Sequence, residues 1–352
     1  MCVRNFLDEW YSESPYIRVH TSGSTGKPKE LHVEKARMME SAKMTCEFLG
    51  LQQGDCALLC MPLDYIAGKM MVVRSIIAGM NLISVKPAMQ PLKYFCGTAD
   101  DNRYDIWQFA SGKQSENISI PIGLKFAAMV PSQARATLDS PEETAIFRGI
   151  NNIIIGGGSI DTKLEAQLRD MPNAIWSTYG MTETLSHIAM RRVSGKTASQ
   201  WYTPMKGISL SLAADGALVI DAPRLCPSPL TTNDIAEFNA SGQFRILGRK
   251  DNVINSGGVK IQIEEVERKL SDALPNDMAE HFAITSCPDE RFGEAVVILT
   301  DRAEIVPALP EAISQLPPYW RPKRIQVVAQ LPKTGSGKPD RAATRQLVSE
   351  KP

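Results

Sequence analysis

Short apolar runs separated by helical patterns organise the first two thirds of the chain. Four such runs lie at residues 56–61, 81–85, 126–130 and 153–155. Between the runs, apolar positions recur at helical spacing over residues 36–49, where Gly50 supplies a stop signal, and again over residues 162–168. Because this alternation is typical of strands covered on both faces, it predicts a large α/β domain with a parallel sheet and flanking helices.

The pattern changes near residue 190 and again near residue 250. Alternating apolar and polar positions at 209–212, 217–220 and 244–247 predict a small antiparallel β element. Beyond residue 250, a helix is marked by apolar residues at Ile263, Val266, Leu270 and Leu274, and strand-like runs follow at 281–287, 295–300 and 325–328. We therefore expect a large domain over residues 1–250 and a smaller α+β domain over residues 251–352.

Composition and charge narrow the possible partners. The chain has 39 basic and 39 acidic residues, so it lacks the electrostatic footprint of a nucleic-acid-binding protein. Its seven cysteines contain no CxxC pair, which favours reduced thiols, and its four histidines lack zinc-ligand spacing. The amino terminus has no apolar signal segment, and the most apolar stretch, residues 70–85, is interrupted by polar residues. We expect a cytoplasmic protein that does not insert into a membrane. The sequence leaves open whether the protein forms a homo-oligomer.

Residues 21–29 carry the strongest chemical signal. Backbone N–H groups, hydroxyls and ammonium charges that can surround a polyphosphate come from Thr21, Ser22, Gly23, Ser24, Thr25, Gly26, Lys27 and Lys29. The segment is not a Walker A loop, because Pro28 follows Lys27 where that motif needs Ser or Thr. A flexible surface loop would have the same composition, so this segment alone decides nothing.

Four further motifs follow in order. They are Thr178-Tyr179-Gly180-Met181-Thr182-Glu183, Thr232-Asn233-Asp234, the run from Leu247 to Ile261 with Arg249, Asp251, Gly257 and Gly258, and the run from Pro332 to Lys338. Tyr179 offers an aromatic face for a purine, and Glu183 offers a hard oxygen ligand for Mg²⁺. Taken singly, each motif also fits a plainer interpretation, such as a β-turn with a core tyrosine, a linker, or a solvated lysine.

Together the five motifs resemble those of adenylate-forming enzymes, the superfamily of acyl-CoA synthetases, luciferases and peptide-synthetase adenylation domains. The resemblance implies that the chain uses ATP, Mg²⁺ and coenzyme A and needs no protein nucleophile. It assigns the 21–29 loop to the phosphates of ATP, and it assigns to the nucleotide Gly157, Gly158, Ser159, Tyr179, Gly180, Asp234 and Arg249. It also implies catalytic roles for Lys338, Thr182 and Glu183, with Glu183 on Mg²⁺, a hinge at Asp251, and coenzyme A at Gly257 and Gly258.

The chain departs from this family in two places. Asn233 stands where the family has glycine, and because asparagine is the non-glycine residue that best tolerates positive φ, we expect the turn to be kept. Typical members carry well over a hundred residues ahead of the phosphate loop, whereas here the loop begins at Thr21. We interpret the chain as a natural short form.

Finer details are similar to the o-succinylbenzoate–CoA ligases of menaquinone synthesis. These details are the run 127–133, the glycines after Ile155, and the run 62–68, in which Tyr65 stands where those ligases usually have histidine. The resemblance implies that Arg74, Ser186 and His187 bind the second carboxylate of a dicarboxylic acid, although Arg74 equally suits a surface position. The alternatives are a ligase for another aryl acid, an adenylation domain that loads a carrier protein, and a degenerate nucleotide-binding regulator.

Overall fold

A nine-stranded sheet forms the centre of the larger lobe in this computed structural model. The structure describes residues 1–20, 30–96, 105–109, 113–116, 123–275, 278, 281–333 and 339–349. The five central strands are parallel, in the spatial order β9 (Ala174–Gly180), β8 (Asn152–Ile155), β7 (Leu124–Met129), β3 (Cys56–Leu59) and β4 (Asn81–Ser84). The predicted parallel sheet is therefore confirmed.

Antiparallel strands, which the apolar pattern did not predict, extend both edges of this sheet. They are β5 (Asp105–Gln108) and β6 (Lys113–Glu116) beyond β4, and β10 (His187–Arg192) and β11 (Thr203–Pro204) beyond β9. A separate two-stranded ribbon consists of β1 (Tyr16–His20) and β2 (Glu30–Glu34). The ends of this ribbon, His20 and Glu30, face each other across the pairing.

Helices cover both faces of the large sheet. Those helices are α1 (Val3–Trp10), α2 (Lys35–Leu49), α3 (Ile66–Ala78), α4 (Pro131–Leu138), α5 (Pro141–Gly149) and α6 (Thr162–Arg169), with a 3-10 turn at η1 (Pro91–Phe95). In β3, Leu59 packs into the cluster that holds Phe6 and Met70, whereas Leu58 packs into the cluster that holds Phe147. Successive strand residues point to opposite faces, which is why the run is apolar throughout.

The expected helix stop is also present, because Gly50 caps α2 in the left-handed conformation with φ 63°. Within the described residues, no helix is both long and apolar enough to cross a bilayer.

The predicted antiparallel element is a four-stranded sheet. Its strands are β12 (Ser209–Leu212), β13 (Ala217–Asp221), β14 (Leu230–Phe238) and β15 (Phe244–Arg249), in sequence order. Arg249, the last residue of β15, lies opposite Asp234 in the middle of β14. This pairing places two of the candidate nucleotide residues side by side.

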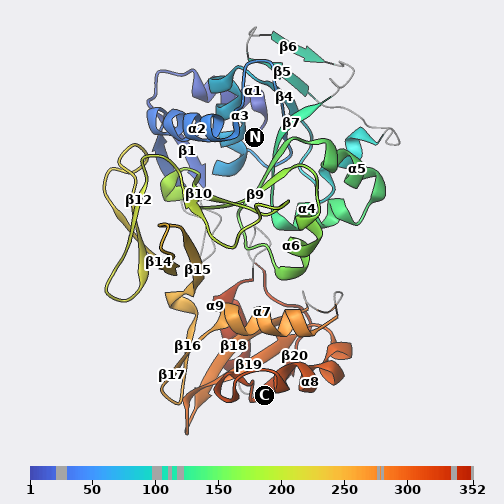
Figure 1. Ribbon diagram of the computed structural model, residues 1–352, viewed down its shortest axis with the longest axis vertical. Coiled ribbons are helices and arrows are strands. Elements are labelled where there is room, and N and C mark those ends of the chain that lie inside the picture. Colours follow the sequence, from blue (N-terminus) through green and yellow to red (C-terminus); the bar gives the residue numbers. More distant parts are fainter. Residues whose placement is uncertain are drawn as a thin grey trace.

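The smaller lobe, orange to red in Figure 1, is an α+β unit as predicted. Its strands are β16 (Val253–Ser256), β17 (Val259–Gln262), β18 (Phe282–Asp289), β19 (Gly293–Thr300) and β20 (Arg324–Val327). Its helices are α7 (Ile263–Ala273), α8 (Leu309–Ser314) and α9 (Arg341–Ser349), with 3-10 turns at η3 (Lys250–Asn252), η4 (Ala303–Ala308) and η5 (Pro318–Trp320). Glu264 and Glu265 lie in the first turn of α7, where a negative charge interacts favourably with the helix dipole.

Candidate active site

The turn between β9 and β10 is built around a close backbone crossing at Gly180. A Cβ atom there would lie 2.2 Å from the carbonyl oxygen of Ser186 and 2.5 Å from the Cα of His187, so no side chain fits. The chain continues through η2 (Thr182–Thr184) and then Leu185, which is the only described non-glycine residue with positive φ, at 67°. Gly180 is needed for this close approach and not for a left-handed conformation, because it is not among the described glycines with positive φ.

The loops after β8 and β9 lie next to each other at one end of the sheet. The two strands are parallel neighbours, so the exposed Gly157, Gly158 and Ser159 lie at the same edge as Tyr179. A Cβ atom on Gly156 would lie 2.4 Å from Thr178 Oγ1, which shows how closely the two segments pass. The carboxyl end of parallel strands is where ligands bind in open α/β sheets, and most of the described residues that we predict to bind the nucleotide gather here.

A chain of polar contacts joins this edge to the start of the smaller lobe. The Tyr179 hydroxyl donates to Asp234 Oδ2 at 2.6 Å, and Arg249 Nη1 donates to Asp234 Oδ1 at 3.3 Å. Arg249 also binds both carboxylate oxygens of Asp251, at 2.9 and 2.8 Å, and holds the pKa of Asp251 below its usual value. Burial, reinforced by the Asp234 carboxylate, raises the pKa of Tyr179, so its hydroxyl keeps the proton that it donates.

One sequence expectation is wrong here. Asn233 lies inside β14, and it is not among the described residues with positive φ, so the glycine-like turn that we expected is absent. The strand continues through this position, and the Asp234 N–H group donates to Thr232 Oγ1 at 3.1 Å. Asp234 is therefore presented from an extended strand beside Arg249.

A second polar chain lies on the other side of the β9–β10 turn and is buried. Arg74 of α3 is only 2% exposed, which excludes the surface position considered from the sequence. Its Nη2 donates to Ser186 Oγ at 2.5 Å, and Ser186 Oγ lies 3.2 Å from His187 Nδ1. Arg74 Nε is buried without a hydrogen-bond partner, and none of the described carboxylates pairs with this guanidinium. Burial lowers the pKa of Arg74 to about 10, so it remains charged at neutral pH.

The order of donors along this chain fixes the tautomer of His187. Thr45 Oγ1 donates to the backbone oxygen of Ser41 at 3.2 Å, so it accepts from His187 Nε2, which lies 3.0 Å away. His187 Nδ1 then accepts from the Ser186 hydroxyl, and Ser186 Oγ accepts from Arg74. Burial, together with the charge of Arg74, lowers the pKa of His187 well below its usual value, so its ring is neutral.

Thr45 is a member of this chain that the sequence interpretation missed. It lies on the buried face of α2 and has no exposed surface. The signal was a polar residue within the helical stripe of Ala42, Cys46 and Leu49. A buried hydroxyl needs a partner, but the sequence could not indicate that the partner is 142 residues away.

The Gly257-Gly258 turn lies on the smaller lobe between β16 and β17. Both glycines have positive φ, at 58° and 80°, so the glycine requirement is conformational. A Cβ atom on Gly257 would lie 3.2 Å from the ring of Phe292 and 3.7 Å from that of Tyr319, which is 54% exposed. The cations of Arg291 and Lys323 lie 5.6 and 5.5 Å from the Phe292 ring. The turn is thus bordered by aromatic and basic groups.

The predicted 21–29 loop and the predicted catalytic Lys338 lie outside the described residues. Glu183 is exposed in η2, beside Thr182. Within the described residues, no cluster of three or more His, Cys, Asp or Glu side chains could hold a metal. One carboxylate is nevertheless what Mg²⁺ needs when substrate phosphates supply the other ligands, so Glu183 fits the ion.

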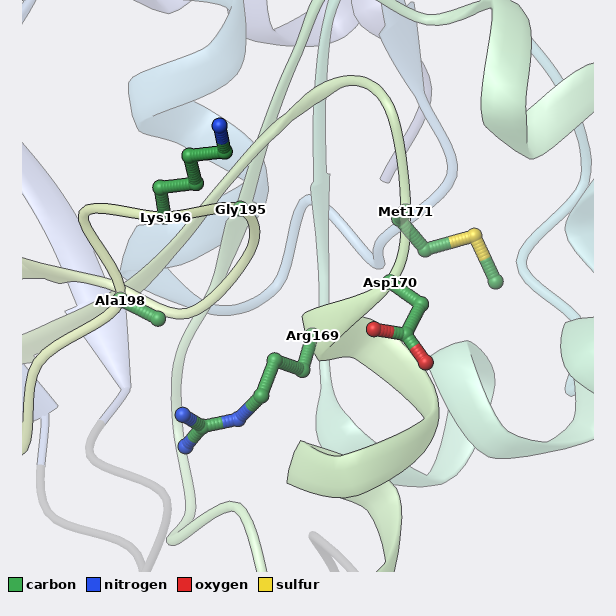
Figure 2. A pocket seen from close by; sticks show the side chains of 6 residues that line it. All are labelled: Arg169, Asp170, Met171, Gly195, Lys196 and Ala198. Carbon is green, nitrogen blue, oxygen red and sulfur yellow. The ribbon is translucent and has the colours of Figure 1, made fainter.

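A shallow depression lies at the opposite end of the sheet. It is lined by Arg169, Asp170, Met171, Gly195, Lys196 and Ala198 (Figure 2). Asp170 and Met171 precede the amino end of β9, whereas the polar chains described above gather at its carboxyl end. The depression is therefore separate from the candidate active site.

Comparison with known proteins agrees with the family resemblance found in the sequence. The family model of the AMP-binding enzyme C-terminal domain matches residues 265–338. The 2-succinylbenzoate–CoA ligase of Bacillus thuringiensis subsp. konkukian is 24% identical, with 94% of this chain and 70% of that protein covered. The o-succinylbenzoate CoA synthetase of Bacillus subtilis, solved with its acyl-adenylate intermediate, is 20% identical with a TM-score of 0.72, covering 95% of this chain and 69% of that chain, and it shares the fold.

A solved protein from Dyadobacter fermentans DSM 18053, described as an acyl-CoA synthetase (AMP-forming)/AMP-acid ligase II-like protein, is similar over almost its whole length. The two chains are 30% identical with a TM-score of 0.60, and the match covers 98% of this chain and 93% of that one. This identity and coverage, with the matching C-terminal domain, are what common descent predicts. The chain belongs to the family of AMP-forming acyl-CoA synthetases and AMP-acid ligases.

Proposed function

We propose that this protein is an ATP-dependent acid–CoA ligase that activates o-succinylbenzoate through an acyl-adenylate. The observation that carries the choice of acid is the buried guanidinium of Arg74, which has no carboxylate partner among the described residues. A buried unpaired cation is costly, and a substrate carboxylate placed beside it would offset that cost. The names of the similar Bacillus ligases support the same acid.

In the first half-reaction, one carboxylate of the acid attacks the α-phosphorus of ATP, forms the acyl-phosphate bond and releases pyrophosphate. No protein nucleophile takes part. We assign Asp234 and Arg249 to the ribose hydroxyls and Tyr179 to the face of the purine. Lys338 and the 21–29 loop stabilise the charge that develops on the phosphate oxygens. Mg²⁺ held by Glu183 and the phosphates would neutralise part of that charge.

In the second half-reaction, the thiol of coenzyme A attacks the acyl carbon, the thioester forms, AMP leaves and the thiol proton passes to solvent. We assign the turn at Gly257 and Gly258 to the coenzyme A side of the site. Phe292, Tyr319 and the nearby cations support this assignment, because an adenine ring and phosphates suit aromatic and basic neighbours.

We also propose that the two domains meet at Asp251. The buried clusters of the larger lobe extend to Phe244, and those of the smaller lobe begin at Ile254. Asp251 lies in the short 3-10 turn between them and is held by Arg249. The cytoplasmic location and the oligomeric state stay predictions from the sequence.

The competing functions differ in whether they release pyrophosphate, in which acid they activate, and in whether the acyl group goes to coenzyme A or to a carrier protein. A coupled assay of pyrophosphate release over a panel of aryl acids, with and without coenzyme A, separates them. A ligase for another aryl acid would prefer that acid, and an adenylation domain would load a carrier protein but not coenzyme A. A nucleotide-binding regulator would bind ATP and release no pyrophosphate.

Lys338→Ala should abolish adenylate formation. A positioned cation that acts on charge in the transition state contributes about 10²- to 10³-fold in rate. Thioester formation from synthetic acyl-adenylate should continue, since that step does not involve the leaving pyrophosphate. Lys333→Ala, which removes an exposed lysine from the same segment, is the control. Equal loss in both half-reactions would assign Lys338 a structural role instead.

Arg74→Met should raise KM for o-succinylbenzoate roughly ten- to a hundred-fold, because a charge-assisted hydrogen bond contributes about 1.5–3 kcal/mol. Methionine keeps most of the buried volume while it removes the charge. KM for ATP should stay nearly unchanged, as should KM for an analogue that lacks the second carboxylate. A variant that binds o-succinylbenzoate normally would rule out the proposed acid subsite.

The neutral His187 should make folding stability depend on pH. Its pKa is lowered in the folded protein, so between that lowered value and about 6.5 only the unfolded chain takes up the proton. The free energy of unfolding should therefore fall as the pH drops below about 6.5, by up to about 1.4 kcal/mol per pH unit. Urea titrations of the wild type and of His187→Gln at several pH values isolate the contribution of His187 to this pH dependence. Identical slopes in the two proteins would contradict it.

Asp251→Pro should separate the two half-reactions. Proline fixes φ near −65°, which a 3-10 turn accommodates but a large domain rotation does not. We expect ATP–pyrophosphate exchange to persist while thioester production falls by orders of magnitude. If both activities are kept, or both are lost together, Asp251 is not the hinge and the domain boundary lies elsewhere.

A further inference from the structure

Lys69 is a second buried cation on α3. Its residue surface is 1% exposed, and it is among the largest fully buried side chains of the protein. Lysine is rarely buried unless it is paired, because removing an ammonium group from water is costly. The groups that contact Lys69 should therefore show which interactions stabilise its buried charge.

Lys69 and Glu9 together hold a single residue of β1. Lys69 Nζ donates to the backbone oxygen of Arg18 at 2.7 Å, while Glu9 Oε1 accepts from the backbone N–H of the same residue at 3.1 Å. The two side chains also pair with each other, with 3.8 Å between Lys69 Nζ and Glu9 Oε2. The ring of Phe6 lies 5.6 Å from the ammonium group. Both backbone groups of Arg18 are thus held by one ion pair.

Among the described residues, no strand pairs with the edge of β1 that this ion pair occupies. The β1–β2 ribbon has two strands in the part of the chain that the structure describes, and such a ribbon is marginally stable when it stands alone. Further along the same strand, His20 forms a parallel bridge with Tyr65, which precedes α3. The ribbon is therefore fixed to the core through α1 and α3, by contacts at Arg18 and His20.

We propose that Lys69 and Glu9 form a clamp that positions β1 and β2 for ATP binding, which makes Lys69 a positioning residue of the adenylation reaction. The proposal rests on the proposed function, because β1 and β2 are the strands that the 21–29 segment connects. Burial lowers the pKa of Lys69 and the Glu9 carboxylate opposes that effect, so the pair has a physical reason to persist as an ion pair.

The test compares Lys69→Met with the wild type by equilibrium dialysis with Mg·ATP alone, and by ATP–pyrophosphate exchange. The dissociation constant and KM for ATP should rise about tenfold, as expected for the loss of a charge-assisted hydrogen bond. KM for the acid should not change. Glu9→Gln, which keeps an acceptor for the Arg18 N–H group, should have a smaller effect, and Lys69→Arg should restore most of the affinity.

A control variant separates positioning from general stability. Phe147→Leu weakens the core on the other face of the sheet, far from β1 in the pattern of buried contacts. If it lowers Tm as much as Lys69→Met and raises the ATP dissociation constant equally, the clamp is merely structural and the proposal fails. If Lys69→Met does not fold, the ATP affinities of Lys69→Arg and Glu9→Gln decide between the two interpretations. Unchanged ATP affinity in Glu9→Gln, with a normal Tm, would also overturn the clamp proposal. If the wild-type protein binds ATP but activates no acid, only the proposed function is contradicted. The clamp proposal would remain testable, because the dialysis comparison measures ATP binding alone.

Discussion

Two buried charges on one helix constrain the rest of the larger lobe. Lys69 and Arg74 lie five positions apart on α3, which is buried from Gly68 to Ser75. At 100° per residue these side chains leave the helix in different directions, one toward β1 and the other toward the β9–β10 turn. A helix is rigid over this length, so the parts of the protein that these cations hold are fixed relative to each other. Lys69 is paired with Glu9, whereas Arg74 has no carboxylate partner among the described residues, and this difference supports the proposal that Arg74 binds a substrate carboxylate.

The crossing at Gly180 lets one turn serve two polar chains. On the β9 side, Tyr179 reaches Asp234, and on the β10 side His187 and Ser186 reach Arg74. Any side chain at position 180 would force these two segments apart, because its Cβ atom would lie 2.2 Å from the backbone oxygen of Ser186. The cost of the left-handed Leu185 immediately beyond is of the order of 1–2 kcal/mol, which packing of the buried Leu185 side chain offsets. The proposed nucleotide and acid subsites are thus neighbours because the backbone itself makes the turn between them.

The sequence predicted those features that depend on local pattern. Buried strands such as β3 and the stop of α2 at Gly50 follow from apolar runs and helical spacing, and both are present. The antiparallel edge strands carry no such signature. Asn233 does not form a turn because it lies within β14, next to Asp234, which pairs with Arg249 of β15. Arg74 was ambiguous, and Lys69 and Thr45 were missed, for a single reason: their partners are 112, 51 and 142 residues away, and a polar residue in an apolar stripe does not reveal its partner.

Arg249 connects the nucleotide subsite to the domain rotation that we propose about Asp251. It binds Asp234 on β14 and Asp251 in η3 at the same time, so a nucleotide that takes up Arg249 would compete with one or both carboxylates. The contact with Asp251 is bidentate and the one with Asp234 is longer, at 3.3 Å, so the Asp234 contact is the weaker of the two. Ribose hydroxyls that bind Asp234 would loosen this longer contact first and leave Arg249 with Asp251. A rotation about residue 251 would then move the carboxylate while the arginine follows it, which couples the nucleotide subsite to the orientation of the smaller lobe.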